Sequence, residues 1–593
     1  MPNARLAKCL SGPLLFVSVN AAMPAQFPSA GSAPKPEEYA VSGRATDSVT
    51  GAPVRKATIR LSSVALTSSS PKSPGLVAVR LTTISDQDGK FRFEHLQLGE
   101  YRLSGERSGY VATEYGAKTS WELGRILVLG PESHSAEVAV ELVPQASIDG
   151  KVTDADGTPA SAVMVHAVAQ TWARGKMRYA VRASASTNDL GEYRLSGLPP
   201  GQYYISATPR DSLIPAVTYS EGTAAHGGQE ARIVRTFFPR AADFGTALPL
   251  KVQAGQDATG TDIRLRIAAT YHVRGKITGD LSPYTALSLN IMPRDLDVMI
   301  FGGQANVNQD QVFDIAGVDA GAYSINLLGM ENGVGRAIAH LDVEVSKRDL
   351  NNLAIDVPPR ATLNGRLQVQ RKSTREKEPI DFGPTQIYLT SAEDSNFGAI
   401  PISEVEPNGR FILKDILPGK YYLNIRGGPE SAYLSSVRLD GREVLGSELD
   451  LLHDSSGELE VTFSDGAGEI DGTVQMRPTA SRTPGTAPEP GVSGVSVALI
   501  PAVRNADGSG VVFSVADLNG VFTMKRLAPG RYFAYAFERF KAELLENPNI
   551  FKELESKGTE ITLKESEQKQ LQLVPLSADE FTAMLVRRGL LDQ

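Results

Sequence analysis

The stretch of sequence that decides the fold is D-G-K-F-R-F-E-H-L-Q-L-G-E-Y, residues 88–101. It begins with a turn signal, because Asp followed by Gly supplies the positive backbone angle that a tight turn requires. Phe91 and Phe93 then alternate with charged residues, which is typical of a strand with one buried face. Gly99 opens a second turn, and the tyrosine two residues later begins another strand. The stretch therefore predicts two short strands joined by turns.

The same spacing recurs along the chain, with a second glycine ten residues and a tyrosine twelve residues after the first turn glycine. With 55 Gly and 18 Tyr in 593 residues, chance gives about 0.15 such coincidences. Copies about 98 to 120 residues apart indicate domains rather than solenoid repeats. The intact copies are Gly89/Gly99/Tyr101, Gly191/Gly201/Tyr203, Gly409/Gly419/Tyr421 and Gly520/Gly530/Tyr532, and a degenerate copy has Gln311 before Gly321 and Tyr323.

Each copy predicts a particular corner of a sandwich. Pro and Gly at the second turn suit its two backbone angles, with Pro presetting the first and Gly accepting the second. The tyrosine ring is expected to face the core, with its hydroxyl capping the backbone at the corner. A weaker signature, apolar-any-Gly-any-apolar, predicts the first strand of each unit, and its glycines are Gly43, Gly150, Gly275, Gly365 and Gly472. About seven short strands per unit predict a β-sandwich.

Three stretches resemble carboxypeptidase regulatory-like domains: S-D-Q-D-G-K-F-R-F (85–93), I-D-G-K-V-T-D-A-D-G-T-P (148–159) and N-D-L-G-E-Y-R-L-S-G-L-P-P-G-Q-Y (188–203). The resemblance implies a transthyretin-like, carbohydrate-binding-like fold over residues 39–575. The segment 237–266 resembles an extension found in large multi-domain bacterial members. We therefore expect an all-β chain, a tandem array of about five seven-stranded transthyretin-like (prealbumin-like, Greek-key) β-sandwich domains with short C-terminal helices.

The first residues have the pattern of an export signal, in which the positive Arg5 and Lys8 precede a largely apolar segment. The alternative is a short buried helix, which Gly12 and Pro13 would interrupt. Cys9, the single cysteine, lies inside this segment, so the mature chain is expected to form no disulfide. No later stretch reaches the roughly 18 apolar residues that a membrane-spanning helix needs, so no transmembrane span is expected.

The predicted domain boundaries fall near residues 145, 268, 359 and 466, where a new apolar-Gly-apolar signature follows an acidic strand-like segment. The predicted segments are 1–25 (signal peptide), 26–38 (linker), 39–145 (β-sandwich 1), 146–268 (β-sandwich 2 with the extension), 269–359 (β-sandwich 3, degenerate), 360–466 (β-sandwich 4), 467–575 (β-sandwich 5) and 576–593 (C-terminal helix).

Helix is expected only near the end of the chain. The segment 540–557 is a helix broken around Pro548, and a second helix over 577–591 starts at a capping box of Ser577 and Glu580. Both helices are expected to pack on the last sandwich. Polar insertions are expected to form exposed loops that carry binding specificity, and they are 62–75, 371–377 and 476–491.

The motifs of common enzymes and metal sites are missing from the sequence. It contains no HExxH, no G-x-S-x-G and no P-loop, so we assign no catalytic, cofactor-binding or metal-binding residue. The formal net charge of −8 provides no basic face for nucleic acid. The seven histidines are scattered without metal-ligand spacing, and they are His95, His134, His166, His226, His272, His340 and His453.

Two further features of the sequence are candidates for ligand sites. The acidic turns 86–89 and 154–157 are similar to calcium loops, but the EF-hand pattern fails because its last position holds Gln97 and Val165, so turn chemistry is the better explanation. Trp121 and Trp172, the two tryptophans, are candidates for stacking on a sugar ring, although covering a core edge is the more common role.

Repetition without catalytic motifs predicts an exported, non-enzymatic multi-domain binding or spacer protein of the cell envelope. Its location is expected to be periplasmic, outer-membrane-associated or extracellular, and its expected partner is a glycan or an envelope protein. No cofactor is expected. The alternative is an accessory subunit of a peptidase or other hydrolase, or such an enzyme itself, with an unrecognised site.

Overall fold

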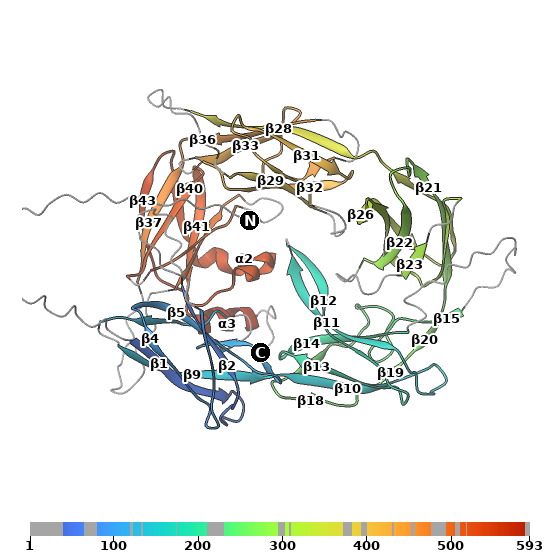
Figure 1. Ribbon diagram of the computed structural model, residues 1–593, viewed down its shortest axis with the longest axis horizontal. Helices are drawn as coiled ribbons and strands as arrows, with labels where there is room; N and C mark the ends of the chain where they lie inside the picture. Colours follow the sequence, from blue (N-terminus) through green and yellow to red (C-terminus); the bar gives the residue numbers. More distant parts are fainter. Residues whose placement is uncertain are drawn as a thin grey trace, which may run out of the picture. The chain divides into compact units, whose positions relative to one another are not determined.

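In the part of the chain that the structure describes, the β-strands form five pairs of sheets (Figure 1). Each pair encloses a hydrophobic core of its own. We call these pairs, in chain order, sandwiches 1 to 5. The computed structural model describes residues 39–64, 80–118, 122–131, 134–173, 175–209, 231–294, 303–306, 310–371, 382, 384–392, 400–429, 432–451, 457–475, 494–503, 510–517 and 519–587. The predicted all-β fold is confirmed.

Several predicted features lie outside the described residues. They are the signal peptide, the linker, Cys9, Trp121, the insertion 476–491 and most of the insertions 62–75 and 371–377. Among the helices of the described part, none combines the length and the apolar character that a membrane crossing needs.

Sandwich 1 contains β1 (Tyr39–Asp47), β2 (Thr58–Ser63), β3 (Arg80–Ile84), β4 (Lys90–Leu96), β5 (Gly99–Glu106), β6 (Tyr110–Val111), β7 (Thr113–Glu114), β8 (Ile126–Leu129) and β9 (Ser135–Pro144). One sheet has the order β4-β1-β9-β6, and the other has the order β3-β2-β5-β7 with β8 also paired to β5.

Sandwich 2 contains β10 (Ala146–Thr153), β11 (Met164–Ala173), β12 (Lys176–Ser186), β13 (Glu192–Leu198), β14 (Gly201–Thr208), β15 (Ala231–Val234), β16 (Thr236–Phe237), β17 (Leu250–Val252), β18 (Asp257–Ala258), β19 (Ile263–Arg264) and β20 (Arg266–Ala269). Its sheets have the orders β13-β10-β18, with β19 also paired to β10, and β12-β11-β14-β16, with β17 also paired to β14; β15 and β20 form a separate pair.

Sandwich 3 contains β21 (Tyr271–Gly279), β22 (Ala286–Pro293), β23 (Gly303–Asn306), β24 (Val312–Val318), β25 (Gly321–Glu331), β26 (Val334–Val345) and β27 (Leu350–Val357). Sandwich 4 contains β28 (Ala361–Gln370), β29 (Gln386–Ser391), β30 (Ile402–Glu404), β31 (Arg410–Ile416), β32 (Lys420–Arg426), β33 (Tyr433–Leu439), β34 (Arg442–Glu443), β35 (Leu449–Asp450) and β36 (Glu458–Ser464). The sheet orders are β24-β21-β27 and β23-β22-β25-β26 in sandwich 3, and β31-β28-β36-β33-β34 and β30-β29-β32-β35 in sandwich 4.

Sandwich 5 contains β37 (Gly468–Val474), β38 (Ser496–Pro501), β39 (Val512–Val515), β40 (Val521–Leu527), β41 (Gly530–Phe537), β42 (Thr559–Leu563) and β43 (Gln568–Leu573). Its sheets have the orders β40-β37-β43 and β39-β38-β41-β42. In all five sandwiches the first strand lies between an antiparallel partner, which follows the first turn glycine or Gln311, and a parallel partner late in the unit.

The first turn has the same backbone form in every copy. Its glycines have positive φ angles, +75° at Gly89, +73° at Gly191, +83° at Gly409 and +74° at Gly520. Gln311 keeps a φ of +62°, so the degenerate copy turns in the same way. In each case the carbonyl of this residue accepts a hydrogen bond from the first strand, and the donors are the backbone N–H groups of Ala45, Val152, Ile277, Leu367 and Val474.

The prediction for the second turn was wrong in its backbone angle. Gly201 and its counterparts in sandwiches 3 to 5 do not have positive φ; only Gly99, at +154°, does. The left-handed residue instead lies in a β-bulge, where two residues of the turn strand face one residue of the first strand. The bulge residues and their φ angles are His95 (57°), Gly197 (81°), Gly317 (79°), Asp415 (57°) and Arg526 (59°).

The tyrosine corner forms as predicted. The hydroxyl of Tyr203 donates to the carbonyl of Pro199 at 2.7 Å, and the ring is buried. Tyr323 differs in that its hydroxyl donates to the carboxylate of Asp319. The other corner bonds reach the carbonyl four residues earlier: Tyr101 to Gln97 (2.9 Å), Tyr421 to Leu417 (2.8 Å) and Tyr532 to Ala528 (2.6 Å).

The glycine of the first strand is required because an aromatic side chain and, in three sandwiches, a backbone carbonyl leave no room for a Cβ atom. A Cβ atom at Gly365 would lie 2.0 Å from the ring of Phe411, which is far inside van der Waals contact. In sandwich 5 the Phe522 ring is likewise the group nearest to a Cβ at Gly472. At Gly43, Gly150 and Gly275 an aromatic side chain also lies within 3.0 Å of the added Cβ, but a backbone carbonyl oxygen of the parallel side lies closer, at 2.1 to 2.3 Å. The weaker sequence signature therefore marks a packing contact inside each sandwich.

The C-terminal helical segments are η2 (Ala542–Glu546), α2 (Pro548–Leu554), η3 (Glu555–Lys557) and α3 (Ala578–Arg587). Pro548 is the first residue of α2, and the side chain of Asn547 caps that helix by accepting from Asn549 N at 3.0 Å. The capping box is confirmed, since Glu580 N donates to Ser577 Oγ at 3.1 Å. The apolar sides of η2, α2 and α3 pack on β38 and β41 of sandwich 5.

Candidate functional site

Sandwich 2 differs from the other four in its last parallel strand. This strand is interrupted, so β18 pairs with the beginning of β10 and β19 pairs with its end. Between them, residues 259–262 leave the ladder opposite the middle of β10. The carboxylate of Asp262 replaces a backbone acceptor there, because its Oδ1 accepts from Lys151 N at 2.8 Å. Thr261 N donates to the Asp149 carbonyl at 3.1 Å.

Tyr193 adapts the core to this interruption. The other sandwiches have Phe at its position, whereas the Tyr193 hydroxyl donates to the carbonyl of Thr261 at 2.6 Å. The ring is buried, and burial raises the pKa of the hydroxyl, so it remains a neutral donor. The phenol therefore satisfies a carbonyl that would otherwise lose its partner in the broken ladder.

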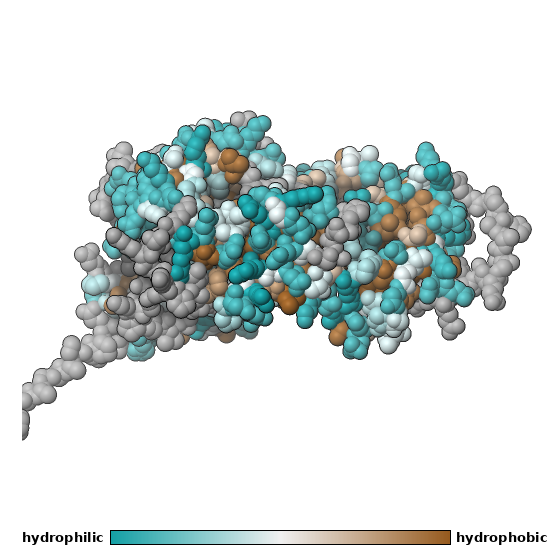
Figure 2. Space-filling model, turned by 90° about the horizontal axis from the view of Figure 1, so that it is seen from above, coloured by the Kyte–Doolittle hydropathy of each residue, from teal (hydrophilic) through white to brown (hydrophobic). Residues whose placement is uncertain are grey.

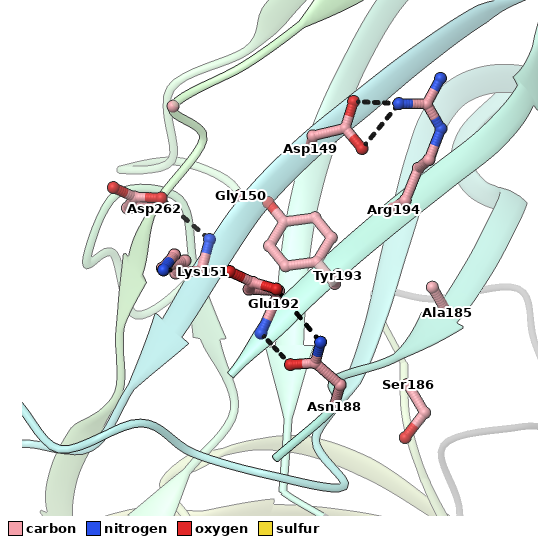
Figure 3. A pocket seen from close by; sticks show the side chains of 11 residues that line it. Asp149, Gly150, Lys151, Ala185, Ser186, Asn188, Glu192, Tyr193, Arg194 and Asp262 are labelled. Atoms are coloured by element: carbon pink, nitrogen blue, oxygen red, sulfur yellow. Dashed lines mark hydrogen bonds and ion pairs between the residues drawn. The ribbon is translucent and has the colours of Figure 1, made fainter. Parts of the chain in front are cut away.

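A polar hollow of about 590 Å³ lies beside this break (Figure 3). Its walls come from β10, the end of β12, the turn at Asn188, the beginning of β13 and the 259–262 segment. The charged groups that line it are Asp149, Lys151, Glu192, Arg194 and Asp262.

One side of the hollow is an arginine held by two carboxylates. Arg194 Nη1 lies 3.1 and 2.9 Å from the two carboxylate oxygens of Asp149, and its Nη2 lies 2.9 Å from Asp257 Oδ1. Ser147 Oγ lies within hydrogen-bonding distance of both acids, 3.0 Å from Asp149 Oδ2 and 2.5 Å from Asp257 Oδ1, and its single proton can be donated to either of them. The hydrogen bond from Ser147, followed by Arg194, lowers the pKa of Asp257. These contacts fix the guanidinium in one orientation.

The other side pairs a lysine with a glutamate. Lys151 Nζ lies 3.1 Å from Glu192 Oε1, and Asn188 Nδ2 donates to Glu192 Oε2 at 3.2 Å. The hydrogen bond from Asn188 and then that from Lys151 lower the pKa of Glu192. With three carboxylates and two cations, the lining has a small net negative charge and many fixed hydrogen-bonding groups. Such a lining suits a neutral, polar ligand.

The acidic turns are explained by turn chemistry, as predicted. Asp86 Oδ1 accepts from the backbone N–H of Asp88 at 2.9 Å and of Lys90 at 2.7 Å. Asp156 Oδ1 accepts from Thr158 N at 3.1 Å. Within the described residues, no three His, Cys, Asp or Glu side chains gather as a metal site would require.

None of the described histidines lines the hollow. His166 is fully buried in sandwich 2, with Nδ1 2.8 Å from Ser184 Oγ. In sandwich 3, His272 Nδ1 lies 2.6 Å from Asp314 and His340 Nδ1 lies 2.9 Å from Asn326. His95 and His134 belong to sandwich 1, and His226 and His453 lie outside the described residues.

Trp172 is half-buried near the tip of the β11–β12 hairpin, opposite Met177. The hollow touches the other end of that hairpin, at Ala185 and Ser186, so Trp172 does not line it. Sequence reasoning missed the hollow. The residues that could have indicated it are the T-G-T-D run at 259–262, inside the extension 237–266. This run interrupts a strand, but the sequence pattern alone does not show the interruption.

Two regions, residues 40–124 and 147–225, match the model of the carboxypeptidase regulatory-like domain. The resemblance is confirmed for these regions, which contain most of sandwich 1 and the first part of sandwich 2. A search of curated proteins finds no match.

Three of the solved structures that are similar to this chain are the following. The TIE protein of Bacillus anthracis is 10% identical, with coverage of 70% of this chain and 68% of that chain and a TM-score of 0.16. The minor pilin of Streptococcus agalactiae is 11% identical, with coverage of 39% and 96% and a TM-score of 0.21. BcpA, the major pilin subunit of Bacillus cereus, is 11% identical, with coverage of 72% and 99% and a TM-score of 0.13. These scores are too low to carry a functional argument.

Proposed function

We propose that this chain is an exported, non-enzymatic binding and spacer protein, in which sandwich 2 holds a neutral, hydroxyl-rich ligand such as a glycan unit. The observation that carries the proposal is the interrupted parallel strand of sandwich 2, beside which the polar hollow lies. The export signal predicted at residues 1–25 supports a place in the periplasm, at the outer membrane or outside the cell. An envelope protein is the second class of partner.

The chemistry of the hollow supports binding of hydroxyl groups. Its volume of about 590 Å³ lies within the range of small-molecule sites. Carboxylates that are fixed by Arg194 and Asn188 keep lone pairs for hydroxyl donors, and Lys151 offers N–H donors to hydroxyl oxygens. A charged ligand would have to compete with ion pairs that are already formed, whereas a neutral ligand would not.

The pKa values support a non-enzymatic role over the hydrolase alternative. A general acid that works near neutral pH needs a carboxyl group with a raised pKa. In the hollow, by contrast, the hydrogen bonds from Asn188 and Lys151 lower the pKa of the Glu192 carboxyl group. Elsewhere in the described part, each carboxyl group with a resolved shift also has a lowered pKa.

The test is a glycan array followed by calorimetric titration of the best hit against two variants. Lys151→Ala removes a side chain that lines the hollow and is 57% exposed. Lys276→Ala is the matched control, because Lys276 follows Gly275 as Lys151 follows Gly150 but faces an unbroken strand. We expect about tenfold weaker binding for Lys151→Ala, the loss of roughly one or two hydrogen bonds, and no change for Lys276→Ala.

Three results would count against this proposal. If Lys151→Ala and Lys276→Ala bound the ligand equally well, the ligand would bind somewhere other than in the hollow. An empty array together with an empty pull-down from envelope extracts would leave the spacer role alone. Hydrolysis by the purified chain that vanished in Glu192→Gln would favour the enzyme.

A further inference from the structure

A buried ion pair connects two segments that lie 417 residues apart in the sequence, one in sandwich 1 and one in sandwich 5. Arg539 Nη1 lies 3.4 Å from Glu122 Oε2, and the side chains are only 8% and 2% exposed. Arg539 also donates to the carbonyl of Gly116, and Lys118 N donates to Glu122 Oε2 at 3.0 Å. The arginine follows β41, and its partners lie between β7 and β8.

Burial sets this pair apart from the other ion pairs of the described residues. The next most buried, Arg360–Glu331, keeps 21% and 26% of its side-chain surface exposed. A charge removed from water to this degree is stable only when a partner and further hydrogen bonds compensate it. Glu122 and Arg539 provide this for each other, with backbone groups of sandwich 1 completing the set.

Two more contacts lie on the same surface. Lys118 Nζ lies 2.8 Å from Asp579 Oδ1 at the beginning of α3, and this bond is the main cause of a lowered pKa of Asp579. Gly494, just before β38, packs against Ile126 of β8, because a Cβ atom there would lie 2.3 Å from Ile126 Cδ1. The charged contacts and the apolar contact therefore lie on the same surface between sandwich 1 and sandwich 5.

We propose that sandwich 1 and sandwich 5 of the same chain bind each other through this surface. Lys118, Glu122 and Ile126 form the side of sandwich 1, and Arg539, Asp579 and Gly494 form the side of sandwich 5. The contact goes beyond the proposed function. It holds the first and the last sandwich together. A spacer built in this way cannot become longer by moving sandwich 1 away from sandwich 5 unless this contact breaks.

Carbodiimide coupling of the full chain tests this contact, because the reagent joins an amine and a carboxylate only when they touch, forming an amide with loss of water. We expect a Lys118–Asp579 cross-link by mass spectrometry in the monomer fraction. The Lys151–Glu192 pair, 3.1 Å apart within sandwich 2, is the internal reference for reactivity. Lys118→Arg keeps the charge but must abolish this cross-link, which verifies its identity.

Arg539→Met removes the buried charge and is expected to reduce the Lys118–Asp579 cross-link about tenfold or more, because it leaves Glu122 without its partner. Arg531→Met is the matched control, since Arg531 belongs to the same sandwich but forms an exposed pair with Glu560. The Lys151–Glu192 cross-link is expected to stay unchanged in both variants.

A steric pair of variants gives a second readout. Gly494→Ala places a methyl group against Ile126, whereas Gly441→Ala has the same φ of +77° and meets no atom within 4 Å. We expect the Lys118–Asp579 cross-link to fall only in Gly494→Ala. Absence of this cross-link in the wild type while the reference forms, or its presence only in dimers, would overturn the proposal.

Discussion

The contact between a first-strand glycine and the ring above it is the residue-scale feature that all five sandwiches share. The ring is Phe in four sandwiches and Tyr in sandwich 2, where the hydroxyl reaches Thr261. Sequence analysis found both residue types and their spacing, but it assigned the glycine to a strand pattern only. The contact depends on how two strands face each other, which spacing alone does not show.

Gly365→Ala is expected to destabilise sandwich 4 by about 1–3 kcal/mol, because the new methyl group would lie 2.0 Å from the Phe411 ring. Hydrogen exchange of peptides from β28 and β31 measures the change. Gly130→Ala is the control, since nothing lies within 4 Å of the added Cβ. If Gly365→Ala and Gly130→Ala had equal effects, the packing explanation would fail.

Tyr532→Phe removes the corner hydrogen bond, which joins the hydroxyl to the Ala528 carbonyl at 2.6 Å, while the ring stays in the core. We expect a loss of about 1 kcal/mol from sandwich 5. Tyr532→Ala also removes a buried ring and is expected to lose about 3–5 kcal/mol. Denaturant unfolding followed through peptides of β41 distinguishes the two. Equal losses would mean that the hydroxyl contributes nothing.

At the scale of the element, the first turn was predictable and the bulge was not. Asp and Gly signals identified the turn, and even Gln311 keeps its left-handed form. The bulge was not predicted from the sequence, because its left-handed residue is a glycine only at Gly197 and Gly317. In the other three sandwiches His, Asp or Arg occupies this position. The hollow was not predicted for a related reason. It lies beside residues 259–262, where the strand pairing with β10 is interrupted, and a sequence pattern does not show such an interruption.

Gln311→Gly is expected to stabilise sandwich 3 by about 1 kcal/mol, because the backbone already has a φ of +62° that favours glycine. Gly409→Ala should act in the opposite direction, since its φ is +83° and a Cβ would lie 2.3 Å from the Leu367 carbonyl. Thermal unfolding with exchange-based assignment measures both. A destabilised Gln311→Gly would show that contacts of the glutamine outweigh its backbone strain.

Sandwich 2 is expected to lose stability between pH 7 and pH 5 through His166 on β11. Burial lowers the pKa of His166 to about 4, so the folded sandwich keeps the ring neutral while the unfolded chain takes up a proton below its ordinary pKa of 6.5. The stabilisation is complete above that ordinary pKa and is lost as the pH falls toward the folded value. The loss from pH 7 to pH 5 is about 2 kcal/mol.

The measurement uses the fluorescence of Trp172, which lies on β11, in a Trp121→Phe background. His166→Gln removes the titrating group, so its unfolding free energy should change less over this pH interval. Identical pH dependence in both proteins would contradict the assignment. All other titratable groups are the same in both proteins, so their contributions cancel when the two pH dependences are compared.

At the scale of the whole molecule, the repeated signature predicted the architecture because each copy specifies a complete corner of a sandwich. The domain limits near residues 145, 268, 359 and 466 remain predictions. The hollow proposed as a binding site could not be found from the signature, since the repeated residues explain folding and the hollow depends on residues of sandwich 2 that the other copies do not share. The contact between sandwiches 1 and 5 was likewise invisible, because Glu122 and Arg539 belong to no motif.

Hydrogen exchange of the full chain carrying Tyr203→Ala tests the central claim, that the chain is built from sandwiches with separate cores. Tyr203 is buried in the core of sandwich 2 alone. We predict that exchange protection falls by about 3–5 kcal/mol in β10, β11, β13 and β14, while the strands of sandwiches 3 and 4 keep theirs. Protection lost equally across all five sandwiches, or in none of them, would contradict the account.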